Sequence, residues 1–293
     1  MRGPNEVPAG VTSATTVGVL LALSCSVTWG IANVYVQRAA RTLGDLRAML
    51  WAQLLGSAVL LPLGVLLGGA PARIDLPALA FTAVASGFGY YGMMRAFRQG
   101  PLGAITPVIT GWPVFAAIAG VVWLEEAPSA RQLLGAALIV VGASGNGALS
   151  RGGAWTGSKV DAFGWAVASA VGFGLMTAGV ARLRPDIGDL TVVPLVWGAQ
   201  WVALLPFVVR SPGILTPPDR WGAVAGMALF EAAGFVAFSL ATRFAPVAVV
   251  SPPASLSTLL TAAFAALVLR EHIGAARWGL IAVVVAGTVL IAG

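Results

Sequence analysis

The residue best placed to do chemistry is Glu231, which lies in the middle of the apolar run from Met227 to Phe235. If this run crosses a membrane, a charge at the bilayer centre costs about 2.5–3.5 kcal/mol on insertion scales, so a carboxyl group there is expected to have a function. We interpret Glu231 as the counter-ion of a cationic substrate or as a carboxyl group that carries a coupling proton. The structural alternative is a neutral glutamic acid that forms a hydrogen bond within a helix bundle.

Aromatic side chains recur at depths that match that of Glu231. Trp29 and Asn33 are four residues apart and therefore share a helical face. Several aromatic rings with one carboxylate suit an ammonium group through cation–π attraction, and they would equally stack on an aromatic amino acid. Tryptophans near segment ends are instead interpreted as an interfacial belt. The predicted substrate-binding residues are Glu231, Trp29, Asn33, Tyr90, Trp112, Trp165, Phe173, Trp197 and Phe235.

Prolines stand at equivalent places in two apolar segments. Thr106-Pro107 and Ser251-Pro252-Pro253 correspond at a shift of 145 residues, and Pro113 is additional. A proline inside a helix removes a backbone hydrogen bond and kinks the axis. We interpret Pro107, Pro113, Pro252 and Pro253 as hinges around a central cavity, with static kinks as the alternative.

The amino-acid composition indicates that these residues lie within a membrane. The chain is 58% hydrophobic and only 10% charged, whereas a typical soluble domain has about 25% charged residues. The excess apolar surface must therefore face lipid. The basic residues are scattered singly or in pairs between apolar segments, which excludes a nucleic-acid surface. No metal-ligand cluster, phosphate-binding loop or catalytic motif is present in the sequence, so we expect no cofactor, no metal and no enzyme activity.

About 20 apolar residues in a helix span the hydrocarbon layer. Breaks that carry Arg, Asp, Pro and Gly divide the chain into ten such segments joined by short connections. The segments are expected near residues 14–37, 46–68, 76–97, 101–123, 131–149, 160–182, 189–209, 219–242, 246–269 and 274–292. The predicted fold class is an all-α integral membrane protein with ten transmembrane helices.

The sequence also repeats itself. Gly44-Asp45-Leu46 recurs as Gly188-Asp189-Leu190, and Glu126 falls on Glu271 at nearly the same shift. The predicted domains are an N-terminal unit of residues 1–150 and a C-terminal unit of residues 151–293. Each unit has an odd number of helices, five, so the two must have opposite orientations in the membrane. Inverted repeats of this kind are typical of secondary transporters, which hold substrate between the halves.

Several segments resemble the EamA branch of the drug/metabolite transporter superfamily. They are Trp29-Gly30, Leu124-Glu125-Glu126 through Arg131-Gln132-Leu133-Leu134-Gly135 to Val141-Gly142, and Leu269-Arg270-Glu271 through Trp278-Gly279 to Ala286-Gly287. The resemblance covers the whole chain and implies a carrier built from two inverted five-helix repeats. It does not indicate a substrate. Glu126 and Glu271 lie at helix ends beside arginines, and we interpret them as structural.

The orientation in the membrane stays open. Eleven basic residues fall on the side opposite the termini and six on the side of the termini, so the positive-inside rule favours external termini. The family resemblance implies cytoplasmic termini, and we give it more weight because several of these arginines sit at helix ends.

The predicted function is secondary transport of a small amine-bearing metabolite, cationic or zwitterionic, by alternating access. The alternatives are proton-coupled export of neutral or aromatic amino acids or drugs and, more remotely, a membrane interaction or lipid-handling protein without carrier activity. The expected partners are a small-molecule substrate, a coupling proton and the lipid bilayer. We expect a monomer in the inner or plasma membrane.

Overall fold

A computed structural model of the chain describes residues 9–123, 129–149, 155–219, 221–245, 253–254 and 256–292. Within these residues the secondary structure is helical throughout. The helices are α1 (Ala9–Leu43), α2 (Asp45–Gly68), α3 (Leu76–Gln99), α4 (Leu102–Ile109), α5 (Trp112–Trp123), α6 (Ala130–Leu149), α7 (Lys159–Ile187), α8 (Val192–Arg210), the 3₁₀ turn η1 (Pro212–Ile214), α9 (Gly222–Phe244), α11 (Ser257–Val268) and α12 (Ala275–Ala292).

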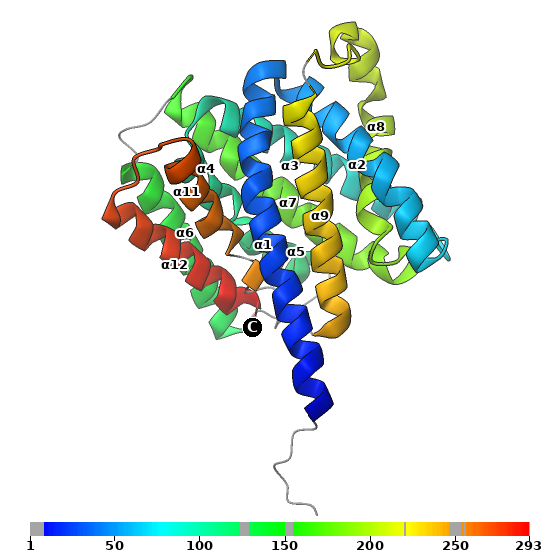
Figure 1. Cartoon of the computed structure of the whole chain (residues 1–293), viewed down its shortest axis with the longest axis horizontal. Coiled ribbons are helices and arrows are strands. Elements are labelled where there is room, and N and C mark those ends of the chain that lie inside the picture. The colour runs from blue at the N-terminus through cyan, green and yellow to red at the C-terminus, as the bar shows by residue number, and fades with distance from the viewer. Residues whose placement is uncertain are drawn as a thin grey trace, which may run out of the picture.

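Four of these helices contain apolar spans long enough to cross a membrane. The spans are Ala14–Leu43, Asp45–Gly68, Lys159–Ile187 and Gly222–Phe244, and shorter apolar helices accompany them. Figure 1 shows the start of α1 and the end of α12 at the same end of the bundle. The all-α membrane fold predicted from the sequence is confirmed, whereas the count of ten spans stays a prediction.

The largest helix contacts join the first half of the chain to the second. Helix α1 packs along α9, α3 packs along α7, and α6 packs along α12. Figure 1 shows α1 and α9 side by side across the middle of the bundle and the α6–α12 pair at one edge. Neither half buries its apolar faces alone, so the core forms between the halves.

Helix directions follow from contacts between named residues. Gln37, near the end of α1, donates hydrogen bonds to the carbonyl oxygens of Phe97 and Gly100 at the end of α3, so α1 and α3 run the same way. In the α3–α7 contact Thr82 lies against Gly179, while Gly92, farther along α3, lies against Ser169, which comes earlier in α7. Helix α7 is therefore antiparallel to α3 and opposite to α1. This is the arrangement expected when inverted repeats begin at α1 and α7.

The repeated Gly-Asp motif turns the chain sharply at both of its positions. Gly44 and Gly188 have φ angles of 83° and 94°, in the region that favours glycine. The aspartates that follow are used differently: Asp45 forms ion pairs with Arg95 and Arg98 of α3, whereas Asp189 forms one with Arg184 of α7. The motif thus repeats a backbone turn and not a charge network.

The segment expected as one helix over residues 101–123 is divided into α4 and α5. The turn at Thr110 and Gly111 is closed by a hydrogen bond of 3.1 Å from the Gly111 amide to the Val108 carbonyl oxygen. Pro113, near the start of α5, has no amide hydrogen and therefore cannot continue the α4 hydrogen-bond ladder. The prediction of a continuous helix was wrong, because Pro113 has no amide hydrogen to donate to the Ile109 carbonyl oxygen and the chain turns between the two.

Pro107 frees a carbonyl group that another helix binds. A proline leaves the carbonyl four residues earlier without its helical partner, and here that carbonyl belongs to Gly103. Asn146 of α6 donates to it at 3.0 Å and to the Ala104 carbonyl oxygen at 3.2 Å. Arg277 of α12 in turn donates to the Asn146 side-chain oxygen at 3.1 Å. The freed carbonyl group is therefore tied to both α6 and α12.

Glu271 caps the start of α4 from the other half of the chain. Its two carboxyl oxygens accept hydrogen bonds from the Leu102 and Gly103 amides at 2.8 and 3.0 Å. A carboxylate at a helix N-terminus satisfies orphan amides and interacts favourably with the helix dipole. These contacts agree with the structural interpretation of Glu271, whereas Glu126 lies outside the described residues.

We expect Glu271→Ala to destabilise the protein by about 1.5–3 kcal/mol for each charge-assisted bond, up to a loss that prevents recovery of folded protein. Thermal unfolding in detergent measures the change. Asp219→Asn serves as the control, because Asp219 is exposed in the connection between η1 and α9 and lies outside any helix. Equal melting temperatures for the Glu271 variant and the parent would contradict the capping role.

A second carboxylate, Asp75, orders the opposite end of the bundle. It precedes α3 and accepts a hydrogen bond from the Ala78 amide at 3.1 Å, and Arg182 of α7 pairs with its other oxygen at 3.2 Å. The Ala78 amide, and after it Arg182, hold the pKa of Asp75 below its ordinary value. Asp75 thus links the start of α3 to α7 by charge as well as by packing.

Candidate functional site

Helix α9 positions Glu231 inside the bundle. The apolar run over Gly222–Phe244 contains no proline, so the helix is continuous and Glu231 falls near its middle. The side chain is 7% exposed. Phe235 lies one turn farther on the same face, and the two side chains therefore point into the same region.

The Tyr90 hydroxyl of α3 lies next to the Glu231 carboxyl group of α9, and the two groups interact electrostatically. In this pair the hydroxyl is the proton donor and the carboxyl group is the acceptor. The described residues contain no ion pair from lysine or arginine to Glu231. The carboxyl group therefore keeps its capacity to bind a proton or an external cation.

A continuous row of aromatic rings borders the Glu231–Tyr90 pair. Trp29 contacts Phe235 with ring centroids 5.3 Å apart, and Phe235 contacts Trp197 at 5.4 Å. Trp197 contacts Tyr90 at 6.0 Å, and Tyr90 contacts Phe173 at 5.0 Å. All four contacts are edge-to-face, the geometry that ring quadrupoles favour. The row draws on helices from both halves: α1, α3, α7, α8 and α9.

A glycine in α9 allows the row to form. A Cβ atom built on Gly234 would lie 2.4 Å from the Trp29 ring, a distance no real contact allows. The Trp29 indole therefore lies directly on the α9 backbone, one residue from Phe235. A larger residue at position 234 would push Trp29 out of the row.

Two buried amides extend the polar part of this region along α8 and α2. Gln200 donates a hydrogen bond of 2.7 Å to Gln53, and each side chain is 1% exposed. The Gln53 amide nitrogen and the Gln200 amide oxygen have no partner within the described part of the chain. Whichever way the two amides are turned, the pair presents one free donor and one free acceptor. The sequence analysis assigned no role to this pair.

The Trp197 indole N–H belongs to the same region. It lies near the Tyr90 hydroxyl but forms no hydrogen bond with any of the described residues. Trp197 and Gln200 are three residues apart in α8 and share a face. The rings and the glutamine pair therefore form one continuous surface, which we call the central cluster: Trp29, Tyr90, Phe173, Trp197, Phe235, Glu231, Gln53 and Gln200.

The remaining predicted binding residues have other surroundings. Asn33 donates a hydrogen bond of 2.9 Å to the Thr261 hydroxyl and so ties α1 to α11. Trp165 packs on Tyr91 with ring centroids 5.3 Å apart, and Arg95 lies over its ring. Trp112 is the first residue of α5 and half-buried. The described contacts do not connect these three residues directly to Glu231, and their binding roles stay predictions.

The predicted hinge residues are partly described. Pro107 lies inside α4 and Pro113 near the start of α5. The Pro253 carbonyl oxygen accepts a hydrogen bond from the Ser26 hydroxyl of α1. Pro252 lies outside the described residues. Their role as hinges stays a prediction.

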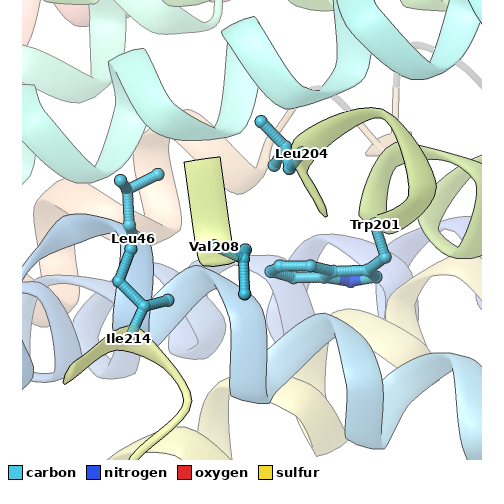
Figure 2. A pocket seen from close by; sticks show the side chains of 5 residues that line it. All are labelled: Leu46, Trp201, Leu204, Val208 and Ile214. Atoms are coloured by element: carbon cyan, nitrogen blue, oxygen red, sulfur yellow. The ribbon is translucent and has the colours of Figure 1, made fainter. Parts of the chain in front are cut away.

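Two hollows open elsewhere in the bundle, and neither is lined by Glu231. Figure 2 shows the smaller, an apolar space of about 10 Å³ between Leu46, Trp201, Leu204, Val208 and Ile214. A space of that size holds no more than about one water molecule. The larger, of about 400 Å³, opens where α2 begins and α3 ends. The central cavity expected between the hinge prolines is neither of these hollows, since Glu231 lines neither of them and aromatic rings pack closely around its carboxyl group.

These features define a multi-pass membrane protein whose two halves meet around an enclosed carboxyl group. The profile of the EamA-like transporter family matches residues 16–147 and again residues 162–293, and the chain belongs to this family. The family resemblance inferred from the sequence is confirmed. Members of the family are membrane transporters and not enzymes.

Comparison with solved structures supports the same fold. The crystal structure of another protein aligns with this chain with a TM-score of 0.67 and 14% sequence identity. The alignment covers 94% of this chain and 96% of that protein's chain. At this identity the likeness concerns the fold alone. No curated protein matches the sequence.

Proposed function

We propose that this protein is a secondary carrier of a small amine-bearing metabolite, cationic or zwitterionic, and that Glu231 binds the amine. The observation that carries the proposal is the buried Glu231 carboxyl group, which lies next to Tyr90 within a row of aromatic rings from both halves. A carboxylate supplies the opposite charge, and ring faces attract an ammonium group. A bulky sugar phosphate would need basic groups at this depth, whereas the central cluster contains none.

In this proposal the packed arrangement is a closed state of the carrier. An incoming ammonium group replaces the Tyr90 hydroxyl as the partner of Glu231. The aromatic rings, which now contact one another edge to face, rotate so that their faces contact the ammonium group. The free donor and acceptor of Gln53 and Gln200 bind a polar group elsewhere on the substrate. Motion between the halves then exposes the central cluster to one side of the membrane at a time.

A second candidate is proton-coupled export of neutral or aromatic amino acids. It is favoured by the same absence of a basic partner for Glu231 among the described residues. In that case Glu231 would release its proton as substrate binds, and the rings would hold the side chain of the amino acid. Proton coupling and a passive counter-ion differ in their response to a pH gradient.

Counterflow in proteoliposomes tests the leading proposal. Vesicles loaded with unlabelled phenethylamine or choline are expected to accumulate the same amine in labelled form. Phenethyl alcohol, which lacks the positive charge, is the control, and vesicles loaded with it are expected to show no counterflow of labelled phenethyl alcohol. A pH gradient imposed at zero membrane potential then separates the two candidates, since only the proton-coupled carrier changes its net flux. Failure of every amine in a broad panel to exchange would overturn the amine proposal.

A further inference from the structure

The larger hollow has a distinct chemical character. It has a volume of about 400 Å³ and opens between the start of α2, the end of α3 and η1. Its polar lining is Asp45, Arg47, Arg95 and the Tyr91 ring, and Leu46 and Ile214 contribute apolar surface. We call it the basic mouth. It lies at the end of the bundle opposite the start of α1.

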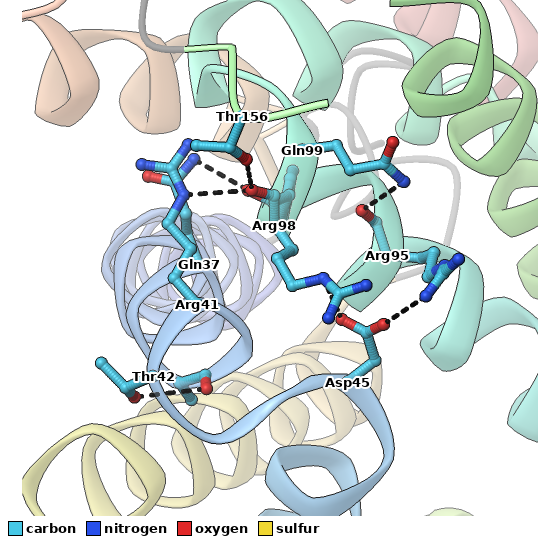
Figure 3. Close-up of polar contacts among 10 residues, drawn as sticks. Gln37, Arg41, Thr42, Asp45, Arg95, Arg98, Gln99 and Thr156 are labelled. Carbon is cyan, nitrogen blue, oxygen red and sulfur yellow. Dashed lines mark hydrogen bonds and ion pairs between the residues drawn. The ribbon is translucent and has the colours of Figure 1, made fainter. Parts of the chain in front are cut away.

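The charges of the basic mouth do not balance. Asp45 lies between two guanidinium groups, with Arg95 at 3.3 Å and Arg98 at 3.1 Å from its oxygens, as Figure 3 shows. The guanidinium group of Arg47 donates to the carbonyl oxygens of Thr216 and Pro217, which carry no net charge. Two guanidinium groups and one carboxylate therefore line the mouth, and a third guanidinium group, that of Arg98, pairs with the same carboxylate from outside the lining.

Arg95 has capacity to bind a further acceptor. Its Nε atom is buried away from the hollow, its Nη1 atom pairs with Asp45, and its Nη2 atom forms no ion pair within the described residues. A guanidinium group carries five N–H donors in a planar fork that fits the two oxygens of a carboxylate. The side chain is also 35% exposed, so a solute can reach it from the hollow.

We propose that the basic mouth binds the oxyanion of the transported solute, a carboxylate, before the solute moves inward to Glu231. This inference rests on the proposed function and deepens it. The substrate is then a zwitterion that carries both an ammonium and a carboxylate group, and not a simple amine. Arg95 and Arg47 are the residues that select it.

The basic mouth and the Glu231 site share helices α2 and α3. Tyr91 lines the basic mouth, and its neighbour Tyr90 lies next to Glu231. Arg95 and Tyr90 are five residues apart, about 7.5 Å along a helix. On α2, Asp45 of the mouth, Met49 and Gln53 follow at intervals of four residues and share a face. An α-amino acid is too short to bind both sites at once, so the two act in sequence.

The test compares three aromatic probes that differ in charge: L-phenylalanine with both groups, phenethylamine with the ammonium alone, and 3-phenylpropionate with the carboxylate alone. We expect Arg95→Gln and Arg47→Gln each to raise the KM for L-phenylalanine about tenfold and to change that for phenethylamine less than about twofold. Raising the salt concentration should weaken phenylalanine uptake by the parent but not by the variants.

Arg210→Gln is the matched control, because Arg210 is an exposed arginine at the end of α8 that does not line the mouth. Melting temperatures report whether each variant folds. If loss of the Asp45 ion pair prevents Arg95→Gln from folding, the test is made with Arg47→Gln alone, since Arg47 forms no ion pair within the described residues. Equal KM values for phenylalanine in all three variants, or no uptake of any carboxylate probe, would overturn the inference. Phenethylamine uptake that still requires Glu231 would leave the proposed function standing.

An anionic lipid headgroup has the same oxyanion chemistry, and the lipid composition separates the two sources. Uptake is measured in vesicles of phosphatidylcholine alone and with phosphatidylglycerol added, and bound lipid is counted by native mass spectrometry. The carboxylate assignment predicts the same effects of the variants in both vesicles. Phosphatidylglycerol that binds only when Arg95 and Arg47 are present, with unchanged phenylalanine KM in the variants, would assign the mouth to lipid and overturn the proposal.

Discussion

Glu231→Gln is expected to lower amine uptake at least about 30-fold, while the protein stays folded. Truncating one partner of a buried charge pair costs about 2–5 kcal/mol, and each 1.4 kcal/mol corresponds to a factor of ten in affinity. Glutamine has the shape of glutamic acid and can accept a hydrogen bond from Tyr90, so the packing of the rings is preserved. Initial rates of phenethylamine counterflow and the melting temperature measure the two parts of this prediction.

Two further variants separate charge from packing at this site. Tyr90→Phe keeps the ring contacts with Trp197 and Phe173 but removes the hydroxyl group, so we expect a smaller change in amine affinity than for Glu231→Gln. Asp161→Asn removes an exposed carboxylate from α7 and should leave uptake unchanged. A Glu231→Gln protein that transports amines like the parent would remove the basis of the proposed site.

The same variant also distinguishes the two candidate functions. If Glu231 is a counter-ion only, Glu231→Gln loses both counterflow and net flux. If Glu231 carries the coupling proton, the variant keeps counterflow, which requires no net proton movement, and loses accumulation driven by a pH gradient. Retained counterflow with no response to pH would therefore support the proton-coupled alternative.

Gly172→Ala is expected to destabilise the protein strongly. A Cβ atom at this position would lie 2.5 Å from the Gly89 amide nitrogen and 2.9 Å from the Ala85 carbonyl oxygen. Both are backbone atoms of α3, so the whole helix would have to move. Overpacking of a well-packed core costs about 1–3 kcal/mol, and we expect the upper end here because no flexible side chain can yield.

Gly164 on the same helix provides a matched control. A Cβ atom at Gly164 meets no atom within 4 Å, and the residue is exposed. Gly164→Ala should be neutral or slightly stabilising, because alanine has a higher helix propensity than glycine by about 1 kcal/mol. Melting temperatures of the two variants, measured in the same detergent, give the comparison. Equal values would show that α3 and α7 separate without cost and that their contact is not part of the core.

Large effects at Gly172 matter for function as well as for folding. Phe173, which ends the aromatic row, is the next residue, and Tyr90 follows Gly89 directly. A shift of α3 away from α7 would therefore separate the Tyr90 and Phe173 rings. Any folded Gly172→Ala protein should show a weakened amine affinity as well as a lowered melting temperature.

The sequence by itself determined the membrane class and the family, because the scarcity of charge and the apolar segments leave no water-soluble fold, and the paired motifs repeat at a nearly constant shift. It also singled out Glu231, since a carboxyl group in an apolar run is conspicuous without any knowledge of its neighbours. Helix breaks were harder to place: residues 101–123 were expected as one helix, whereas the chain turns at Thr110 and Gly111 and α5 begins at Trp112.

The neighbours of Glu231 were decided only by the tertiary structure. Periodicity shows which residues share a face of one helix, but it does not show which face of α3 or α8 turns toward α9. Tyr90, Trp197 and Phe235 meet because α3, α8 and α9 pack at that depth, while Trp165 turns toward Tyr91 and Asn33 toward α11. The Gln53–Gln200 pair and the basic mouth join residues from separate helices, and such contacts follow from the packing of the two halves and not from any local pattern.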